Sequence, residues 1–239
     1  MQPVYKKILL KLSGEGLMGD KTFGVDAKVV SAMAEQIAQV RDMGLEVCLV
    51  VGGGNFFRGA KEAAKGMNRN IADQIGMMAT IMNALFLQDA LKSKGVEAIV
   101  MSGISMSQVC EPYVYRNAIK HLEDRKVVIF AGGTGNPYFT TDTGAALRAC
   151  EMGCDAILKS TQVDGVYDSD PEKNMNAKRY DEISFDEVLE KKLGVMDLTA
   201  ITMAKENNIP IVVFAQNSET SLTDVVCAKG KFTIIKNRG

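Results

Sequence analysis

The sequence predicts an α/β protein with one largely parallel sheet that is covered by helices on both faces. Apolar runs alternate with helical patterns along the chain, and these runs lack the strict apolar–polar alternation of a half-exposed sheet. Helices that connect parallel strands cover both faces of their sheet. No internal repeat, low-complexity segment or linker divides the chain, so we expect a single three-layer α/β/α domain over residues 1–239.

Each expected element follows from a local pattern. Strands are expected at 4–12, 46–51, 98–102, 126–131, 156–159, 209–214 and 232–236. Helices are expected at 27–43, 70–93, 111–122, 143–152, 185–191 and 198–206. The first helix is the clearest, because Asp26 can cap its start, Gly44 follows its end, and apolar residues recur between them at helical spacing.

The helix expected at 70–93 is apolar around much of its circumference. Its apolar residues include Met77, Met78, Ile81, Met82, Leu85, Phe86 and Leu87. Core packing is one explanation. Burial of one face against another subunit is the other, and methionine side chains adapt well to such surfaces. We favour a role in oligomerisation.

Composition and charge exclude several classes of protein. The 28 Lys and Arg residues nearly balance the 29 Asp and Glu residues, so there is no overall basic field of the kind that binds nucleic acid. The early apolar run 8–10 is flanked by lysines, and no segment approaches the roughly 18 apolar residues of a membrane span. We therefore expect a cytoplasmic protein with no membrane attachment.

Cysteine and histidine usage narrows the chemistry further. The five cysteines, Cys48, Cys110, Cys150, Cys154 and Cys227, lack paired Cys-x-x-Cys spacing, so neither a zinc site nor a disulfide framework is expected. The single histidine, His121, is expected to be a solvated helical residue. Most mechanisms that use a histidine base are thereby removed.

Three loops that follow predicted strands favour an anion site. They are the segment after Lys11, the triple glycine 52–54 with Arg58 beyond it, and the run 132–143 of glycines, threonines and an aspartate. Glycine lets the backbone approach a ligand, and hydroxyls and the start of a helix supply donors and partial positive charge. Taken singly, such a loop often only reverses the chain. Together, at one edge of a sheet, the three loops predict a site where several phosphates meet.

Several motifs resemble those of the bacterial UMP kinases in the amino acid kinase family. They are Leu10-Lys11-Leu12-Ser13-Gly14-Glu15, Gly52-Gly53-Gly54-Asn55 with Arg58-Gly59, Gly66-Met67-Asn68-Arg69 leading to Asp73, the run 134–142, and the run 159–167. The resemblance continues through 195–197 and 210–214 and so spans essentially the whole chain. It implies ATP-dependent phosphorylation of UMP to UDP in pyrimidine nucleotide biosynthesis.

The resemblance also implies two nucleotide sites. UMP is expected against Gly53, Asp73, Thr134, Gly135, Asn136, Pro137, Tyr138, Phe139, Thr140 and Thr141, with Asp73 accepting hydrogen bonds from the ribose hydroxyls and the loop holding the 5′-phosphate. ATP is expected along Lys11, Leu12, Ser13, Gly14, Gly54 and Arg58, with Thr161, Tyr167 and Asp170 near the adenosine. The UMP-binding part then covers about 1–155, and the ATP-binding part about 156–239 plus the loop 11–14. Structural alternatives are a packed turn aromatic for Tyr167 and a turn cap for Asp170.

A phosphate acceptor of this kind needs no general base, because a phosphomonoester loses its second proton near pH 6. The expected catalytic residues are Lys11, Arg58, Asp142 and Lys159, with Lys11 and Lys159 contacting the transferred group from opposite sides. Mg²⁺ is expected to be carried mainly by the ATP phosphates. Asp142 is expected to orient a lysine or to help hold the metal, and an N-cap on a helix that begins at Thr143 is the competing role.

Relatives in this branch imply a homohexamer with GTP as activator and UTP as inhibitor. The segment Gly19, Asp20, Lys21, Thr22, Phe23 and Gly24 corresponds to one linked to the GTP site. Two other functions remain open from the residues. One is a sibling kinase that phosphorylates a carboxylate or carbamate, and the other is a nucleotide sensor that has lost catalysis.

Overall fold

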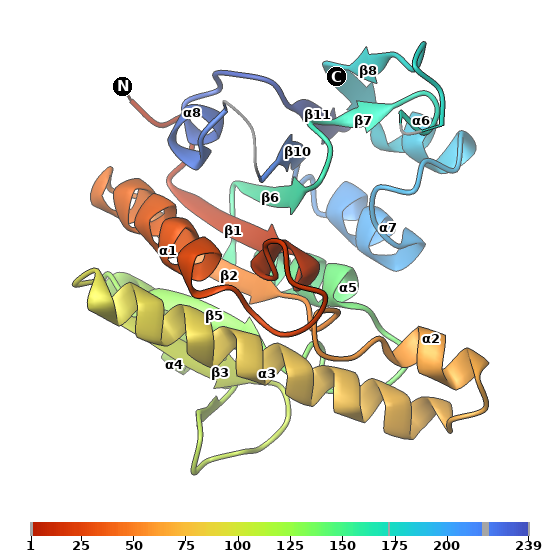
Figure 1. The fold of residues 1–239 in the computed structure, drawn as a ribbon. Helices are drawn as coiled ribbons and strands as arrows, with labels where there is room; N and C mark the ends of the chain where they lie inside the picture. Colours follow the sequence, from red (N-terminus) through yellow and green to blue (C-terminus); the bar gives the residue numbers. More distant parts are fainter. Residues whose placement is uncertain (1, 172, 217–219, 239) are drawn as a thin grey trace.

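A nine-stranded sheet forms the centre of the computed structural model, which describes residues 2–171, 173–216 and 220–238 (Figure 1). In spatial order its strands are β4 (Glu111–Pro112), β3 (Ala98–Ser102), β5 (Val127–Ala131), β2 (Glu46–Val51), β1 (Lys7–Leu12), β6 (Ala156–Thr161), β10 (Ile211–Ala215), β11 (Thr233–Lys236) and β9 (Glu182–Ser184). The strands from β4 to β10 are parallel, and β11 runs antiparallel to β10. A separate two-stranded ribbon pairs β7 (Val166–Tyr167) with β8 (Arg179–Tyr180).

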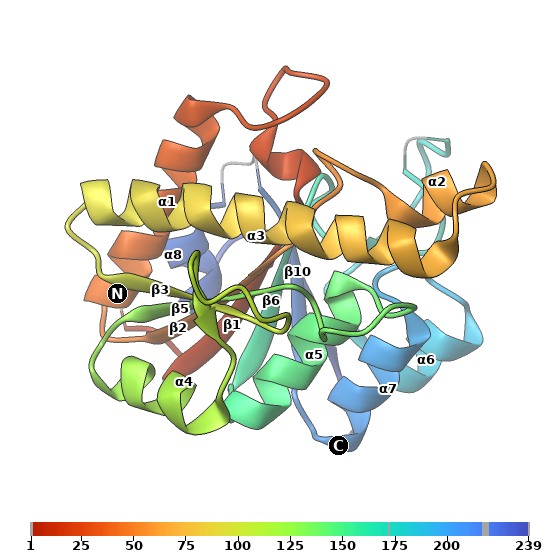
Figure 2. The same cartoon turned by 90° about the horizontal axis from the view of Figure 1, so that it is seen from below.

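Helices cover both faces of the sheet, as Figure 2 shows most clearly. One face carries α1 (Ala27–Asp42), α3 (Arg69–Ser93) and α8 (Leu222–Val226). The other carries α4 (Tyr115–Glu123), α5 (Thr141–Met152), α6 (Phe185–Glu190) and α7 (Leu198–Glu206). Two short helices, the 3₁₀ turn Glu15–Leu17 and α2 (Gly59–Ala64), lie in the loops after β1 and β2. The expected three-layer α/β/α architecture is confirmed.

The alternation of side chains along β1 decides which layer receives Lys11. Ile8, Leu10 and Leu12 are buried in the core beneath α1 and α3. Leu9 is buried in the opposite core, beneath α5. Because successive side chains of a strand point to opposite faces, Lys11 points to the same side as Leu9. The side chain therefore lies under α5.

The expected strands all form, with ends that differ by no more than three residues from the prediction. The helix expected at 111–122 is wrong at its start, because Glu111–Pro112 form the edge strand β4 and α4 begins only at Tyr115. Proline donates no backbone hydrogen bond and is tolerated at such an edge. The remaining elements that the sequence did not predict are two to six residues long and too short to show a period.

His121 differs from its expected solvated state. Its side chain is mostly buried, and Nε2 lies 3.0 Å from Glu111 Oε2. The reason is the unpredicted strand β4, which places Glu111 beside α4. All five cysteines are free, and Cys48, Cys154 and Cys227 are buried. In the described part of the chain, no helix is both long and apolar enough to cross a membrane.

The long helix α3 buries one face and leaves an apolar stripe on another. Ile81 and Leu87 are in the core, whereas Met78, Met82 and Phe86 are each 45% exposed. These three side chains are four residues apart and so share one face of the helix. The stripe is consistent with the expectation that α3 takes part in assembly.

A buried pair of asparagines fixes the loop after β2. Asn83 of α3 donates through Nδ2 to the Gly52 carbonyl and to Asn55 Oδ1, both at 2.7 Å. Asn55 in turn donates through Nδ2 to the Gly24 carbonyl and to Asn83 Oδ1, both at 2.9 Å. Buried polar groups are stabilising only when they are paired in this way. The pair therefore holds the glycine loop against α3.

Replacing Asn83 with alanine should lower the free energy of unfolding by about 2 kcal/mol or more, because the Gly52 carbonyl and the Asn55 side chain lose buried partners. Chemical denaturation measures the change. Asn176→Ala is the control, because Asn176 is exposed and should change stability by less than about 0.5 kcal/mol. Equal stability of the two variants would contradict this role.

Candidate functional site

The carboxyl ends of β1, β2, β5, β6 and β10 meet at one edge of the sheet, and the expected site residues lie there. β1 lies between β2 and β6, so strands from the first and last parts of the chain are neighbours at this point. In open α/β sheets, ligands bind outside the carboxyl ends of strands where the strand order changes direction. The fold therefore offers a binding edge.

Two lysines and an aspartate form an ion cluster at this edge. Lys11 of β1 and Lys159 of β6 are register partners on neighbouring parallel strands, so their side chains lie side by side on the α5 face. Asp142 lies between them, with Oδ1 at 2.6 Å from Lys11 Nζ and Oδ2 at 2.9 Å from Lys159 Nζ. Lys159 Nζ also donates to the Val195 carbonyl. The cluster carries one net positive charge.

The start of α5 explains how Asp142 comes to face the lysines. Thr140 caps the helix, since its Oγ1 accepts hydrogen bonds from the backbone N–H groups of Asp142 at 3.0 Å and Thr143 at 3.4 Å. The competing role for Asp142, an N-cap of a helix beginning at Thr143, is wrong. Thr140 caps the helix instead, and Asp142 in the first turn keeps both carboxylate oxygens for the lysines.

Burial and charge act in opposite directions on this cluster. Burial raises the pKa of Asp142, but the charges of Lys11 and Lys159 outweigh it and hold the pKa below its ordinary value. Burial lowers the pKa of Lys159, and Lys11 adds to this effect, so the pKa stays below that of a free lysine although Asp142 raises it. An anion placed beside Lys159 would raise this pKa.

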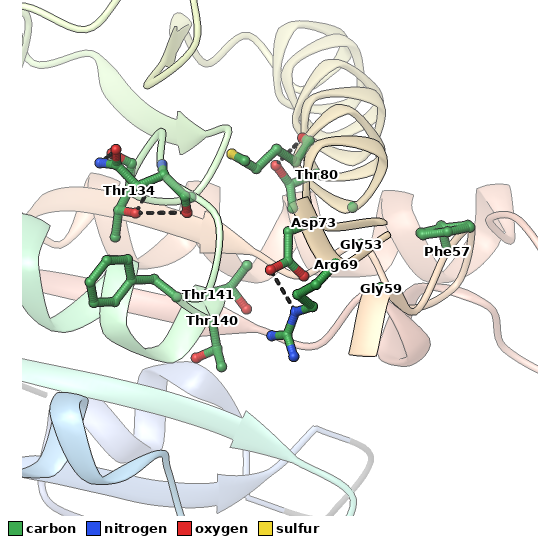
Figure 3. Close-up of a pocket in the computed structure, with 14 residues that line it drawn as sticks. Gly53, Phe57, Gly59, Arg69, Asp73, Thr80, Thr134, Thr140 and Thr141 are labelled. Atoms are coloured by element: carbon green, nitrogen blue, oxygen red, sulfur yellow. Dashed lines mark hydrogen bonds and ion pairs between the residues drawn. The ribbon is translucent and has the colours of Figure 1, made fainter. Parts of the chain in front are cut away.

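A cavity of about 180 Å³ lies between α3 and the loop that precedes α5 (Figure 3). We call it the threonine cavity; it is lined by Gly53, Phe57, Gly59, Arg69, Asp73, Gly76, Met77, Thr80, Gly133, Thr134, Asn136, Phe139, Thr140 and Thr141. Seven of the ten residues expected to bind UMP are among them. Gly135, Pro137 and Tyr138 belong to the same loop but do not line the cavity.

Asp73 ties that loop to α3. Its Oδ2 accepts a hydrogen bond from Arg69 Nε at 2.7 Å and another from the Tyr138 backbone N–H at 2.8 Å. Tyr138 has a φ of 72°, and its ring points outward, 5.6 Å from the Arg69 guanidinium. Both of these protein donors bind the same oxygen of Asp73. The other oxygen, Oδ1, faces Gly59, where an added Cβ would come within 3.0 Å of it.

Two glycines of the site are required by close packing. A Cβ on Gly53 would lie 2.8 Å from Ala79 Cβ and 2.9 Å from the Gly76 carbonyl of α3. A Cβ on Gly14 would lie 2.5 Å from the Gly52 carbonyl. The loops after β1 and β2 therefore pack against each other and against α3, which the sequence reasoning did not attribute to these glycines.

A second cavity, of about 580 Å³, opens beside β6, and we call it the β6 cavity. It is lined by Lys159, Thr161, Val163, Gly165, Val166, Tyr167, Ser169, Asp170, Pro171, Lys192, Leu193, Gly194, Val195 and Val213. Tyr167 donates its hydroxyl to Asp164 Oδ1 at 2.6 Å, so it is both a packed turn residue and a cavity wall. The ion cluster adjoins the β6 cavity through Lys159 and the threonine cavity through Thr141, which precedes Asp142 in the chain, while Lys11 and Asp142 themselves line neither.

Some expected site residues lie outside both cavities. The Arg58 side chain is 54% exposed, and its guanidinium pairs with Glu15. The Leu12 side chain is buried in the core beneath α1, so only its backbone is at the edge. The segment 19–24 lines neither cavity, and its Phe23 packs edge-to-face on Phe56 with ring centroids 5.5 Å apart. Ser13, Gly14 and Gly54 also line neither cavity.

The donor set at the edge suits an anion better than a bare cation. Within the ranges that the structure describes, no three His, Cys, Asp or Glu side chains gather as a metal site. Both oxygens of Asp142 face lysines. This arrangement fits a Mg²⁺ ion that arrives on substrate phosphates, since Mg²⁺ keeps several waters and needs few protein ligands.

Asp197 has several contacts with the site, although the sequence did not indicate it as a site residue. Asp197 caps α7 and also contacts Thr140 and Thr143 at the start of α5. An aspartate directly before a helical pattern is a recognisable cap signal. Its contacts with Thr140 and Thr143, more than fifty residues away in the chain, could not be predicted from a local sequence pattern.

Comparisons with known proteins agree with this architecture. The model of the amino acid kinase family matches residues 6–215. The chain is 54% identical over 233 residues to a uridylate kinase of Paramagnetospirillum magneticum, covering 98% of this chain and 97% of that protein. It is 50% identical over 236 residues to a uridylate kinase of Roseobacter denitrificans, covering 99% and 98%.

Solved structures give the same result. A UMP kinase from Bacillus anthracis superposes with a TM-score of 0.94 at 38% identity, covering 98% of this chain and 97% of that one. A UMP kinase from Ureaplasma parvum superposes with a TM-score of 0.93 at 40% identity, covering 99% and 100%. The resemblance seen in the sequence motifs is confirmed over nearly the full length, and the chain belongs to the amino acid kinase family.

Proposed function

We propose that this protein transfers the γ-phosphoryl group of ATP to UMP and releases UDP and ADP. The Lys11–Asp142–Lys159 cluster is the observation that supports this most strongly, because it places two cations beside both cavities at one sheet edge. Uridylate kinases that are at least half identical over nearly the whole chain support UMP as the acceptor.

UMP is assigned to the threonine cavity. A carboxylate oxygen accepts hydroxyl donors well, and Asp73 Oδ1 is the oxygen that faces Gly59 rather than Arg69 or Tyr138. Asp73 is therefore the residue assigned to the ribose. Thr134, Asn136, Thr140 and Thr141 supply hydroxyl and amide groups around the rest of the nucleotide. This assignment puts the acceptor part in about residues 1–155.

ATP is assigned to the β6 cavity, with its phosphates directed toward the loop after β1. Thr161, Tyr167 and Asp170 lie in the wall assigned to the adenosine. Lys11, the backbone of Ser13 and Gly14, Gly54 and Arg58 are assigned to the polyphosphate. The donor part then comprises about 156–239 together with the loop 11–14, and the two nucleotides meet at the ion cluster.

The chemistry that we propose is in-line transfer without a general base. The acceptor phosphate is already a dianion at neutral pH, so the barrier lies in bringing anions together and stabilising the charge of the transition state. Asp142 holds the ammonium groups of Lys11 and Lys159 in place before the substrates arrive. Bound Mg²⁺ neutralises charge on the ATP phosphates. Preorganised cations in a site with little water are worth far more than in solution.

Assembly and regulation form part of the proposal. The stripe Met78, Met82 and Phe86 on α3 is suited to contact with another copy of the chain, and we propose a homohexamer. GTP is proposed as an activator, acting through the segment 19–24, and UTP as an inhibitor. We place the reaction in the cytoplasm, where its nucleotide substrates are found.

A kinase for a carboxylate or carbamate is the main alternative, since it would share Lys11 and the triple glycine. A sensor without catalysis is the second, and the intact Lys11–Asp142–Lys159 cluster argues against it.

Purified protein with ATP and Mg²⁺ is offered each nucleoside monophosphate and a panel of carboxylates and carbamate, and ADP release is followed. Rapid ADP release with UMP supports the proposal, whereas release only with a carboxylate or carbamate, or tight UMP binding without UDP, contradicts it.

Lys11→Ala should lower kcat by about 10²-fold or more, because one preorganised charge beside the transferred phosphoryl group is lost. Steady-state ADP release measures kcat, and thermal unfolding verifies that the variant is folded. Lys28→Ala, which removes an exposed lysine of α1, is the control and should leave kcat unchanged. A wild-type kcat in Lys11→Ala would remove this residue from the chemistry.

Asp73→Ala should raise the KM for UMP by about 10-fold or more and leave the KM for ATP nearly unchanged, because a charged acceptor for the ribose hydroxyls disappears. Initial rates against each substrate measure the two constants. Arg69→Met keeps the carboxylate and removes only its neighbour, so a smaller rise is expected. An unchanged KM for UMP in Asp73→Ala counts against the ribose contact.

In the pH profile of kcat/KM for ATP, the decrease on the alkaline side (the alkaline limb) should occur at a lower pH than the titration of an ordinary lysine would give. The pKa of Lys159 is lowered in the free enzyme, and its ammonium is lost as the pH rises through that value. Lys159→Arg keeps its charge at these pH values, so the limb of its residual activity should move to higher pH. Limbs at the same pH in both proteins would show that another group titrates.

A further inference from the structure

Asp197 lines neither cavity, yet it contacts the turn that carries Asp142. Its Oδ1 caps α7 by accepting the Ala200 backbone N–H at 2.9 Å. The same carboxylate accepts the Thr143 hydroxyl at 2.9 Å from each oxygen, the Thr143 backbone N–H at 3.2 Å on Oδ2, and the Thr140 hydroxyl on Oδ2. One carboxylate thus holds the starts of two helices.

The two residues that Asp197 contacts in α5 and its cap lie on either side of Asp142 in the sequence. Thr140 lies two residues before Asp142 and Thr143 one residue after it, so both ends of this short turn are held. Two residues before Asp197, the Val195 carbonyl accepts the Lys159 ammonium group. The segment 195–197 therefore holds Lys159 directly and holds Asp142 through its neighbours Thr140 and Thr143. Thr140 lines the threonine cavity and Val195 lines the β6 cavity, so this segment reaches both sides of the site.

We propose that Asp197 is a positioning residue for phosphoryl transfer: it clamps the first turn of α5 so that Asp142 holds Lys11 and Lys159 where the two cavities meet. The inference rests on the proposed function. It assigns no substrate contact to Asp197, which acts through Thr140 and Thr143.

A carboxylate is the group that these contacts need. Asp197 accepts four hydrogen-bond donors with two oxygens, whereas an asparagine offers only one oxygen. Thr143 is buried, so few other hydrogen-bond acceptors are within reach of its hydroxyl. A negative charge is also favourable at a helix N-terminus, and here it is shared by two of them.

The charge of Asp197 reaches Lys159 as well. The charged groups that act on Lys159 are Lys11 from β1, Asp142 from α5 and Asp197 from the start of α7. Burial and Lys11 lower the pKa of Lys159, while Asp142 and Asp197 raise it. Removing the charge of Asp197 should therefore lower this pKa further.

Asp197→Asn is the first test, because asparagine caps helices about as well as aspartate and α7 should stay folded. We expect kcat to fall by about 10-fold or more, with KM values for UMP and ATP within about threefold of wild type, since misplacement near the chemistry affects the transition state most. Asp224→Asn is the matched control: Asp224 accepts the Ser221 hydroxyl in the cap of α8, on the opposite face of the sheet. It should leave kcat unchanged.

A pair of variants at Thr143 separates the clamp from general packing. Thr143→Val removes the hydroxyl and should lower kcat by about threefold or more, whereas Thr143→Ser keeps the hydroxyl and should restore kcat to within about twofold of wild type. Wild-type kcat in both Asp197→Asn and Thr143→Val overturns the proposal. So does a serine variant as slow as the valine variant.

The pH profile provides a readout that a purely structural role would not change. In Asp197→Asn the alkaline limb of kcat/KM should move to lower pH, whereas in Thr143→Val it should stay in place. An unshifted limb in Asp197→Asn contradicts the electrostatic part of the clamp.

The proposed function is tested first with wild-type protein, by UDP formation from UMP. If wild type uses another acceptor, the proposed function fails and the same variants are measured with that acceptor. Hydrogen exchange of the Thr143 amide needs no activity at all. It should become faster in Asp197→Asn than in Asp224→Asn, and equal rates would overturn the clamp.

Discussion

The site depends on one largely buried carboxylate that is held between two ammonium groups. Removing charges from water is expensive unless they are paired, and a buried charge that loses its partner destabilises a protein strongly. Asp142 pairs with both lysines and leaves the cluster with one positive charge in excess. Phosphate groups are the complement that this excess favours. The charges of the cluster are thus paired without a substrate, and the excess positive charge favours an anion.

Three separate parts of the fold create that cluster. The parallel register of β1 and β6 places Lys11 and Lys159 side by side on one face. The cap at Thr140 starts α5 so that Asp142 faces them from its first turn. The segment before α7 then holds Lys159 through Val195 and the α5 turn through Asp197. The loops after β5 and β6 leave the same edge of the sheet, so the threonine cavity adjoins this arrangement through Thr141 and the β6 cavity adjoins it through Lys159.

Local patterns in the sequence predicted the features that depend on residues close together in the chain. The strands β2 and β3 and the helix α7 have the expected bounds, because apolar runs and helical spacing decide them. The strand-end loops and the family resemblance predicted Lys11, Asp142 and Lys159 as site residues, and the structure brings these three side chains together. The helix expected at 111–122 was wrong at its start, since only pairing with β3 makes a strand of Glu111–Pro112. The cap at Thr140 was also missed, because Asp142 is an equally good cap by residue type. Contacts such as Asp73 with the Tyr138 backbone and Asp197 with Thr143 join segments more than fifty residues apart, and no local pattern encodes them.

We propose that two nucleotides meet head to head over the Lys11–Asp142–Lys159 cluster. The decisive experiment is a crystal structure of the protein with UMP, Mg²⁺ and a non-hydrolysable ATP analogue. We expect UMP in the threonine cavity, the analogue in the β6 cavity, and the facing phosphates about 3 Å from the ammonium groups of Lys11 and Lys159. Phosphates that lie far apart, or on the opposite edge of the sheet, would contradict it.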